Sequence, residues 1–233
     1  MKRIALIAAL LSCSLTGFSQ VFMNFEVGYN GQFGSPEGLN YIVQRYNETR
    51  NFLTDEMKPF NHMNGLAVSL GFVYGAYIDV GFIGRSQKRF ATATVNGEDL
   101  KRYLRLRNNG LSLGIGIPLI ADHVKIIPGA RVDFVFPRIS SKVESDNPSY
   151  DEDWEDLYTG TSTYIAPFLK IILGPVNLEP YYAFGDRKLG NIAKVNEELN
   201  PNTYTNDPID IPFNHRGFGF RLTLSLSGYA DPG

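Results

Sequence analysis

Charged residues occur at alternate positions of several short segments that are otherwise apolar. In one of them, Arg131 and Asp133 alternate with Val132 and Phe134. Because successive side chains of a β-strand point to opposite faces, such charges would gather on one face of a sheet. Buried charges are tolerated only when they are paired and hydrogen-bonded, so the pattern predicts an ion-pair network inside the fold. Its expected members are Glu26, Asp79, Asp133, Glu179, Lys125, Arg131, Lys170 and Arg221.

A second cluster of charges is acidic and surrounds Trp154, the single tryptophan of the chain. Hard divalent cations favour oxygen ligands, but the cluster lacks the spacing and the glycine of an EF-hand loop. Exposed aromatic residues are enriched at protein interfaces, so this loop is a candidate contact for a cation or a partner. The alternative is a solvated acidic loop. The residues of the cluster are Asp151, Glu152, Asp153, Trp154, Glu155 and Asp156.

Few residues could support catalysis. The three histidines, His62, His123 and His215, lack the spacing of a zinc-binding motif. The sequence contains no nucleophile elbow, P-loop or dinucleotide-binding fingerprint. One class of β-barrel enzymes modifies lipid A with a histidine and a serine. His62 and Ser86 are a candidate pair of this kind, but nothing in their spacing requires them to meet. We therefore expect no enzymatic activity, no bound metal and no cofactor.

The first twenty residues have the three parts of an export signal. Lys2 and Arg3 precede an apolar run at 4–11, and a short polar stretch follows. The run is much shorter than the ~20 residues that a membrane-spanning helix needs. The sequence therefore predicts a signal peptide at 1–20 and a mature chain that begins at or near Val21.

Cys13, the single cysteine, leaves a second interpretation open, in which the segment is a lipoprotein signal and Cys13 carries the lipid. Cleavage after Gln20 instead leaves a mature chain with no disulfide, thiol nucleophile or cysteine metal site. That cleavage also removes two of the 22 basic residues and leaves 24 acidic ones, a net charge of about −4. A nucleic-acid-binding protein should carry a basic stripe, so we expect no nucleic-acid partner.

After residue 20, apolar and polar residues alternate in eight segments, which is typical of strands with two different faces. These segments are 21–30, 66–75, 78–82, 111–117, 124–136, 165–173, 176–184 and 218–226. Short connections near 75–76, 121–122 and 174–175 alternate with long ones at 34–60, 144–160 and 186–212, and a tight turn lies at 96–99. This arrangement predicts an all-β fold, an eight-stranded antiparallel transmembrane β-barrel at 21–229, with short periplasmic turns and long extracellular loops. Residues 230–233 would form a C-terminal tail.

The composition of the two faces separates a membrane barrel from a soluble one. A soluble barrel points its apolar face inward and needs an outer face rich in Lys and Glu. Here the second face is crowded with glycine and small polar residues, which fit the narrow lumen of an eight-stranded barrel. A lipocalin-like soluble carrier would also need an open apolar interior, which the inward charges oppose. Aromatic residues expected at the membrane interfaces are Tyr74, Tyr77, Phe136, Tyr182 and Phe184.

Three local features complete the prediction. Asn108 to Gly110 interrupts the alternation, which indicates a β-bulge or a hairpin turn. Apolar residues at near-helical spacing within 37–56 predict a short helix in the first long loop. Pro128, Pro167 and Pro180 lie inside three of the expected strands, where proline removes a backbone donor.

The Phe18-Ser19-Gln20 cleavage region, the eight alternating segments and the length resemble the PorT-like small outer-membrane barrels of Bacteroidota. The resemblance extends over nearly the whole chain and rests on pattern, without a diagnostic motif. It implies a location in the outer membrane and a role near type IX protein secretion, in which one founding member is implicated. These barrels usually end on an aromatic residue, whereas here four residues follow Tyr229.

From these features we expect a non-enzymatic outer-membrane barrel that serves as an anchor, scaffold or accessory subunit of an envelope complex. The ion pairs would close its lumen. Its partners would be outer-membrane lipid and other envelope proteins, reached through the extracellular loops. The alternatives are a lipid A-modifying barrel enzyme and a lipocalin-like soluble carrier.

Overall fold

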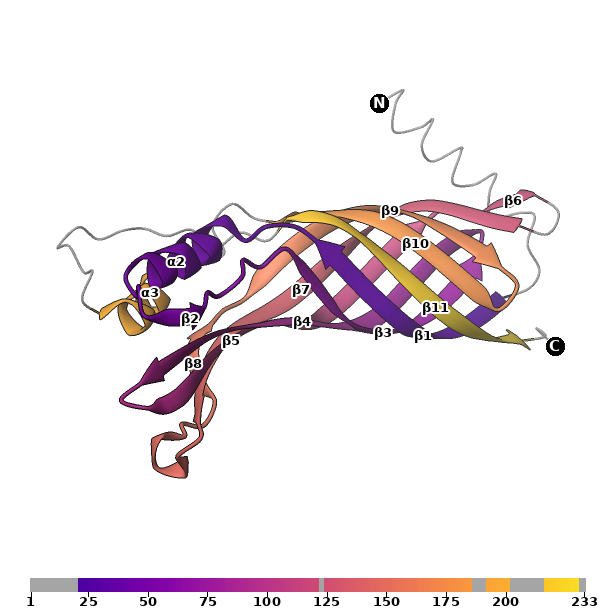
Figure 1. Cartoon of the computed structure of the whole chain (residues 1–233). Helices are drawn as coiled ribbons and strands as arrows, with labels where there is room; N and C mark the ends of the chain where they lie inside the picture. The colour runs from indigo at the N-terminus through magenta and orange to yellow at the C-terminus, as the bar shows by residue number, and fades with distance from the viewer. Residues whose placement is uncertain (1–20, 122–123, 186–191, 202–215, 231–233) are drawn as a thin grey trace, which may run out of the picture.

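The structure, a computed structural model, describes residues 21–121, 124–185, 192–201 and 216–230. The predicted signal peptide at 1–20, the tail beyond residue 230, His123, His215 and most of the predicted loop at 186–212 lie outside these residues. The described chain forms a barrel of antiparallel strands with two helices gathered at one end (Figure 1).

Eight long strands make the wall of the barrel. Each pairs antiparallel with both neighbours, and the β4–β5 pairing closes the ring. The predicted eight-stranded antiparallel barrel is therefore confirmed. In chain order the strands are β1 (Val21–Phe33), β3 (His62–Tyr74), β4 (Ala76–Val95), β5 (Glu98–Gly116), β7 (Val124–Ser145), β9 (Ser162–Leu173), β10 (Val176–Gly185) and β11 (Gly217–Ala230).

The two ends of the barrel differ. At the turn end, where β1 begins and β11 ends, Gly75 and Gly174 connect neighbouring strands with positive φ values of 65° and 59°. Glycine adopts this left-handed conformation without the steric cost of a Cβ atom. A short strand, β6 (Leu119–Ala121), pairs with β7 at the same end. We call the opposite end, which carries the longer connections, the loop end.

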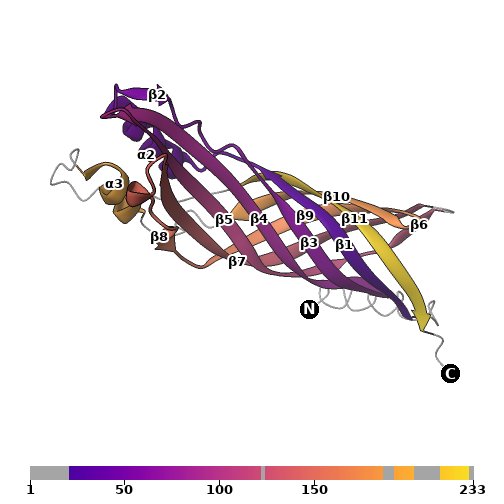
Figure 2. The ribbon, with the colours of Figure 1, turned by 60° about the horizontal axis from the view of Figure 1, so that its bottom comes forward.

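The loop end is covered by a structured cap (Figures 1 and 2). It contains α2 (Glu37–Glu48), β2 (Leu53–Asp55), a 3₁₀ turn η1 (Pro148–Tyr150), β8 (Glu155–Thr159) and α3 (Ala193–Leu199). The helix expected within 37–56 is thus present as α2. Its buried face contains Leu39, Ile42, Val43 and Tyr46, at the spacing of one helical stripe. No helix in the described part of the chain is long and apolar enough to cross a membrane.

The predicted interruption at Asn108–Gly110 is neither a bulge nor a turn. Asn108 pairs with Arg85 on β4 and with Pro137 on β7, and the register continues unbroken on both sides. What changes is the kind of residue that faces inward. On the turn side of this point Ser112 and Gly114 face the lumen, whereas on the loop side Leu104 and Leu106 do.

The outer surface changes in the opposite sense at the same level. Leu111, Leu113 and Ile115 are more than half exposed on the outside of β5, whereas Arg105 and Arg107 continue that outer face toward the loop end. The barrel therefore has a polar interior inside an apolar band, and above it an apolar interior inside a charged surface. This reversal is the physical reason for the interrupted alternation.

One of the aromatic residues expected at the outer surface faces the lumen instead. Tyr77 is fully buried, because its parity on β4 is that of Asp79 and not that of the exposed Ile78. The other three whose side chains are described, Phe136, Tyr182 and Phe184, are exposed on the outside as expected.

Candidate functional site: an ion-pair network in the lumen

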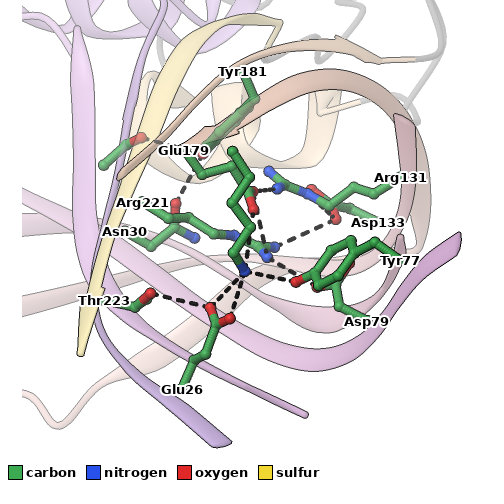
Figure 3. A network of polar contacts seen from close by, with 12 residues as sticks. Glu26, Asn30, Tyr77, Asp79, Arg131, Asp133, Glu179, Tyr181, Arg221 and Thr223 are labelled. Atoms are coloured by element: carbon green, nitrogen blue, oxygen red, sulfur yellow. Dashed lines mark hydrogen bonds and ion pairs between the residues drawn. The ribbon is translucent and has the colours of Figure 1, made fainter. Parts of the chain in front are cut away.

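The buried charges meet inside the apolar band (Figure 3). We call the set Glu26, Tyr77, Asp79, Arg131, Asp133, Lys170, Glu179 and Arg221 the lumen network. Its members come from six of the eight strands, β1, β4, β7, β9, β10 and β11, and each occupies an inward position. The remaining wall leaves room for them, since a Cβ atom at Gly114 of β5 would collide with the Asp79 carboxylate.

Lys170 of β9 forms one half of the network. Its ammonium group lies 2.6 Å and 2.7 Å from the two carboxylate oxygens of Glu26 and donates to the Tyr77 hydroxyl at 2.6 Å. These contacts use the three donors that a lysine ammonium has. Thr223 of β11 donates to Glu26 Oε2 at 3.1 Å. The buried lysine is therefore fully bonded.

Two arginines form the other half. Arg131 donates from Nε to Asp133 Oδ1 at 2.8 Å and from a guanidinium NH group to Glu179. Arg221 lies between three carboxylates, 3.7 Å from Asp79, 3.8 Å from Asp133 and 3.7 Å from Glu179. Because each arginine contacts more than one acid, the contacts join into one network and not into isolated pairs.

Arg85 is a buried base that the sequence analysis missed. It is 2 % exposed and donates to Gln32 of β1 and, at 3.0 Å, to the Tyr181 hydroxyl of β10. Tyr181 also lies under the Arg131 guanidinium, 4.2 Å from ring centre to Cζ, so Arg85 adjoins the lumen network. The alternation that ended at Phe82 in our prediction in fact continues through Arg85 and Gln87. Following it further would have found Arg85.

Lys125, the eighth residue predicted for the network, does not belong to it. It lies at the turn end of β7, opposite Ile172, and is partly exposed. It lies six residue steps from Arg131, which is about 20 Å along a strand. The sequence correctly predicted the face of the strand on which Lys125 lies. Alternation determines that face, but it does not determine how far along the barrel axis a residue lies. The other seven predicted members are brought together.

An apolar layer covers the lumen network toward the loop end. Leu104, Leu106 and Ile139 of the barrel wall are fully buried in the same core cluster as the cap helices. Arg50, just after α2, fixes the cap by donating to Leu199 O of α3 at 2.6 Å and to Asn200 Oδ1 at 3.2 Å. The lumen is thus filled by charged residues at mid-height and by apolar residues above them.

The acidic cluster at 151–156 packs beside the barrel. Trp154 lies under Arg105, with 3.8 Å between its ring centre and the guanidinium carbon. Asp156 contacts Arg138 at 3.2 Å and accepts from Ser140 at 2.8 Å, while Glu152 and Asp153 are exposed. Within the described residues, no three acidic, histidine or cysteine side chains are arranged to hold a metal ion.

His62 and Ser86 both lie at the loop end, on adjacent strands β3 and β4. The hydrogen bonds of His62 run elsewhere: its Nδ1 contacts Asn61 Oδ1 at 2.7 Å and Gln87 Nε2 at 3.4 Å. A groove of about 1000 Å³ opens nearby between α2 and β4, lined by Tyr41, Met57 and Phe90 among others. It lies outside the lumen.

Comparison with known proteins adds little to this description. No protein-family model matches the chain, and no curated protein matches it. Among solved structures, the chain is similar to Ail, the attachment invasion locus protein of Yersinia pestis, crystallised with the heparin analogue sucrose octasulfate. The TM-score is 0.40 and the sequence identity 9 %, over 90 % of this chain and 98 % of Ail. The barrel topology given above rests on the strand pairing itself.

Proposed function

We propose that this chain is a non-enzymatic outer-membrane barrel with a sealed lumen, which anchors a structured extracellular cap as a scaffold or accessory subunit of an envelope complex. The observation that carries the proposal is the reversal of polarity along the barrel. A wall that is apolar outside and ion-paired inside suits a lipid environment, whereas the charged outer face above it suits water.

The apolar band supports insertion into a bilayer. On β7 the outward apolar residues extend from Ile126 to Phe136. Ten residue steps span about 33 Å, which a strand tilt of about 40° reduces to about 25 Å, the height of the apolar band in outer-membrane barrels. In water such a band would exceed the few hundred Å² of contiguous apolar surface that monomeric soluble proteins expose.

The two ends suggest the orientation. Outer-membrane barrels place short turns in the periplasm and long loops outside the cell. The turn end would then be periplasmic, and the cap formed by α2, β2, β8 and α3 would be extracellular. Membership of the PorT-like group, and with it a role near type IX secretion, belongs to this proposal and rests on the signal region and the strand pattern.

The lumen network and the apolar layer above it support a sealed barrel. An ion moving through the lumen would have to displace buried ion pairs and then cross Leu104, Leu106 and Ile139. Both steps are unfavourable, since separating a buried pair leaves uncompensated charge and apolar constrictions exclude water. A carrier function would also need an interior space that these side chains fill.

Three kinds of measurement on the chain, in cells, in native membrane and after purification, test the proposal. It should fractionate with outer membranes, require detergent and migrate differently on gels before and after heating. Planar-bilayer recordings should show no stable conductance. Affinity purification from native outer membrane should recover other envelope proteins with it. Recovery as a soluble monomer, or large steady channels, would contradict the proposal.

A further inference from the structure

Four cations form a compact group on the outer surface of β4, β5 and β7. We call them the cationic rows: Lys88, Arg105, Arg107 and Arg138. In the strand register Lys88 is opposite Arg105, and Arg107 is opposite Arg138. Like charges directly opposite each other on adjacent strands destabilise a sheet unless an opposite charge lies close by.

The protein itself supplies little of that opposite charge. Asp156 contacts Arg138 at 3.2 Å, and both side chains are close to half exposed, so the pair is weak. Arg107 has no carboxylate within ion-pair distance among the residues described. Burial lowers the pKa of Arg105, and the neighbouring charge of Arg107 lowers it further.

The surface farther from the apolar band is different. On the same two strands, Lys142 of β7 lies 3.0 Å from Glu144, and Lys101 of β5 is directly opposite Glu144. The hydrogen bond from Lys142 holds the pKa of Glu144 below its usual range. Glu144 thus offsets the charge of Lys142 near the loop tips and also acts on Lys88, whereas in the described part of the chain Arg107 and Arg138 beside the band have only the weak Asp156 contact.

The cationic rows lie at the edge of the apolar band. Arg138 follows the exposed Phe136 on the same face of β7, and Arg107 lies four residues from Leu111 on β5, about 13 Å along the strand. Long basic side chains keep their charge at a membrane interface while their stems cover apolar surface. A bilayer around the band would therefore place its headgroups beside these four cations.

On the β1 and β11 side of the barrel, the described residues include no comparable group of cations, although Arg216 is exposed just before β11. At the loop end of β1 and β11, the edge of the band is formed by the aromatic rings of Tyr29, Phe33 and Phe220. The ring centres of Tyr29 and Phe220 are 5.4 Å apart, and those of Phe33 and Phe220 are 6.2 Å apart. Aromatic rings suit any interface between lipid and water. Among the described residues, cations that face each other across strands are thus gathered on β4, β5 and β7, which favours an anionic neighbour at this face.

We propose that the cationic rows bind the phosphate groups of glycolipid headgroups in the outer leaflet. Guanidinium groups match phosphate oxygens in bidentate hydrogen bonds, and two pairs of facing cations can hold two phosphates or one that bridges them. This inference rests on the proposed outer-membrane location and deepens it by naming the lipid chemistry at one face.

Trp154 provides the measurement, because it is the single tryptophan and lies against Arg105. The folded barrel in dodecyl maltoside is titrated with bisphosphorylated lipid A, with dephosphorylated lipid A and with inorganic phosphate, and the fluorescence is followed. We expect saturable binding of the bisphosphorylated lipid alone. In Arg107→Gln/Arg138→Gln the dissociation constant should rise by roughly tenfold or more, since each interfacial cation contributes to anionic lipid binding.

The matched control is Arg45→Gln/Lys194→Gln, which removes the same charge from the cap helices α2 and α3, away from the cationic rows. It should bind nearly as the wild type does. A heat-dependent gel shift and fractionation with the outer membrane show whether each variant is folded and inserted.

Each alternative result overturns the inference in a different way. Equal binding of the dephosphorylated lipid means that phosphate is not recognised. If inorganic phosphate displaces the lipid at similar concentration, the cationic rows are a site for free anions. If the control variant loses as much affinity for the lipid, the effect is one of net charge. If the wild-type chain fails to insert at all, the proposed function falls as well. Insertion without phosphate discrimination removes this inference alone.

Discussion

Lys170 on β9 and Glu26 on β1 lie 144 residues apart in the chain, yet the lysine Nζ is 2.6 Å from Glu26 Oε1 across the lumen. Both side chains are almost completely buried. The pair forms only when the two strands have this register in a closed ring. The lumen network therefore depends on the register of the barrel that it stabilises.

Replacing one member of this pair should destabilise the barrel strongly. Lys170→Met leaves Glu26 buried without its cation, and breaking a buried pair in this way costs about 3–5 kcal/mol in the free energy of unfolding. Urea titration of the barrel in lipid vesicles, followed by circular dichroism, measures the effect. The double variant Glu26→Gln/Lys170→Met should lose much less than the sum of the single losses, because it leaves no lone charge. Additive losses would show that the pair is not coupled.

Conductance should appear when an arginine of the network is shortened. Arg131→Ala and Arg221→Ala each remove contacts to two or more carboxylates and leave a hole in the lumen. Arginine cannot lose its proton to relieve burial, so the arginine of each wild-type pair stays charged. Because the apolar layer of Leu104, Leu106 and Ile139 remains above the network, we expect only rare and brief cation-selective openings in bilayer recordings of these variants, and none in the wild type. Lys125→Ala, at the turn end and partly exposed, is the control and should stay closed. If neither arginine variant conducts ions, the apolar layer and not the lumen network seals the barrel.

Introducing an arginine into the apolar band tests whether that surface faces lipid or water. Leu113 is 51 % exposed on the outside of β5. A soluble protein would tolerate Leu113→Arg, whereas at the middle of a bilayer the change costs about 2–4 kcal/mol. Asn109→Arg, on the same face near the edge of the band, should cost about 0–1 kcal/mol. The free energies of unfolding in vesicles of both variants give the comparison. Equal values would contradict a membrane location for the band.

The cap should loosen when Arg50 is replaced. Its guanidinium joins α2 to α3 through Leu199 O and Asn200 Oδ1 and covers the Tyr46 ring at 4.0 Å. Hydrogen bonds to charged groups contribute about 1.5–3 kcal/mol each, less where solvent reaches them. Hydrogen exchange in α3 should therefore speed up in Arg50→Met, while exchange in the barrel strands should not change. Arg45→Met, on the exposed side of α2, is the matched control. Unaltered exchange in α3 would show that the apolar contacts alone hold the cap.

The sequence by itself determined the strands and their faces. Period-2 alternation assigned Glu26, Asp133, Lys170 and Arg221 to the inside because a strand exposes successive side chains on opposite sides. Glycine and small residues at the same parity indicated a narrow lumen. These are local properties, and they need no knowledge of which strands are neighbours.

Only the tertiary structure decided how far along the barrel axis each residue lies and which residues it contacts. It excluded Lys125 from the lumen network, added Arg85, and showed that Asn108 lies in an unbroken strand. The break in alternation predicted a change in the backbone, whereas it is the polarity of the two faces that changes there. With the proposed membrane location, the physical reason is that one barrel crosses two surroundings. Where lipid gives way to water, the preferred polarity of each face inverts while the backbone continues, and the level of that boundary is set by all eight strands together.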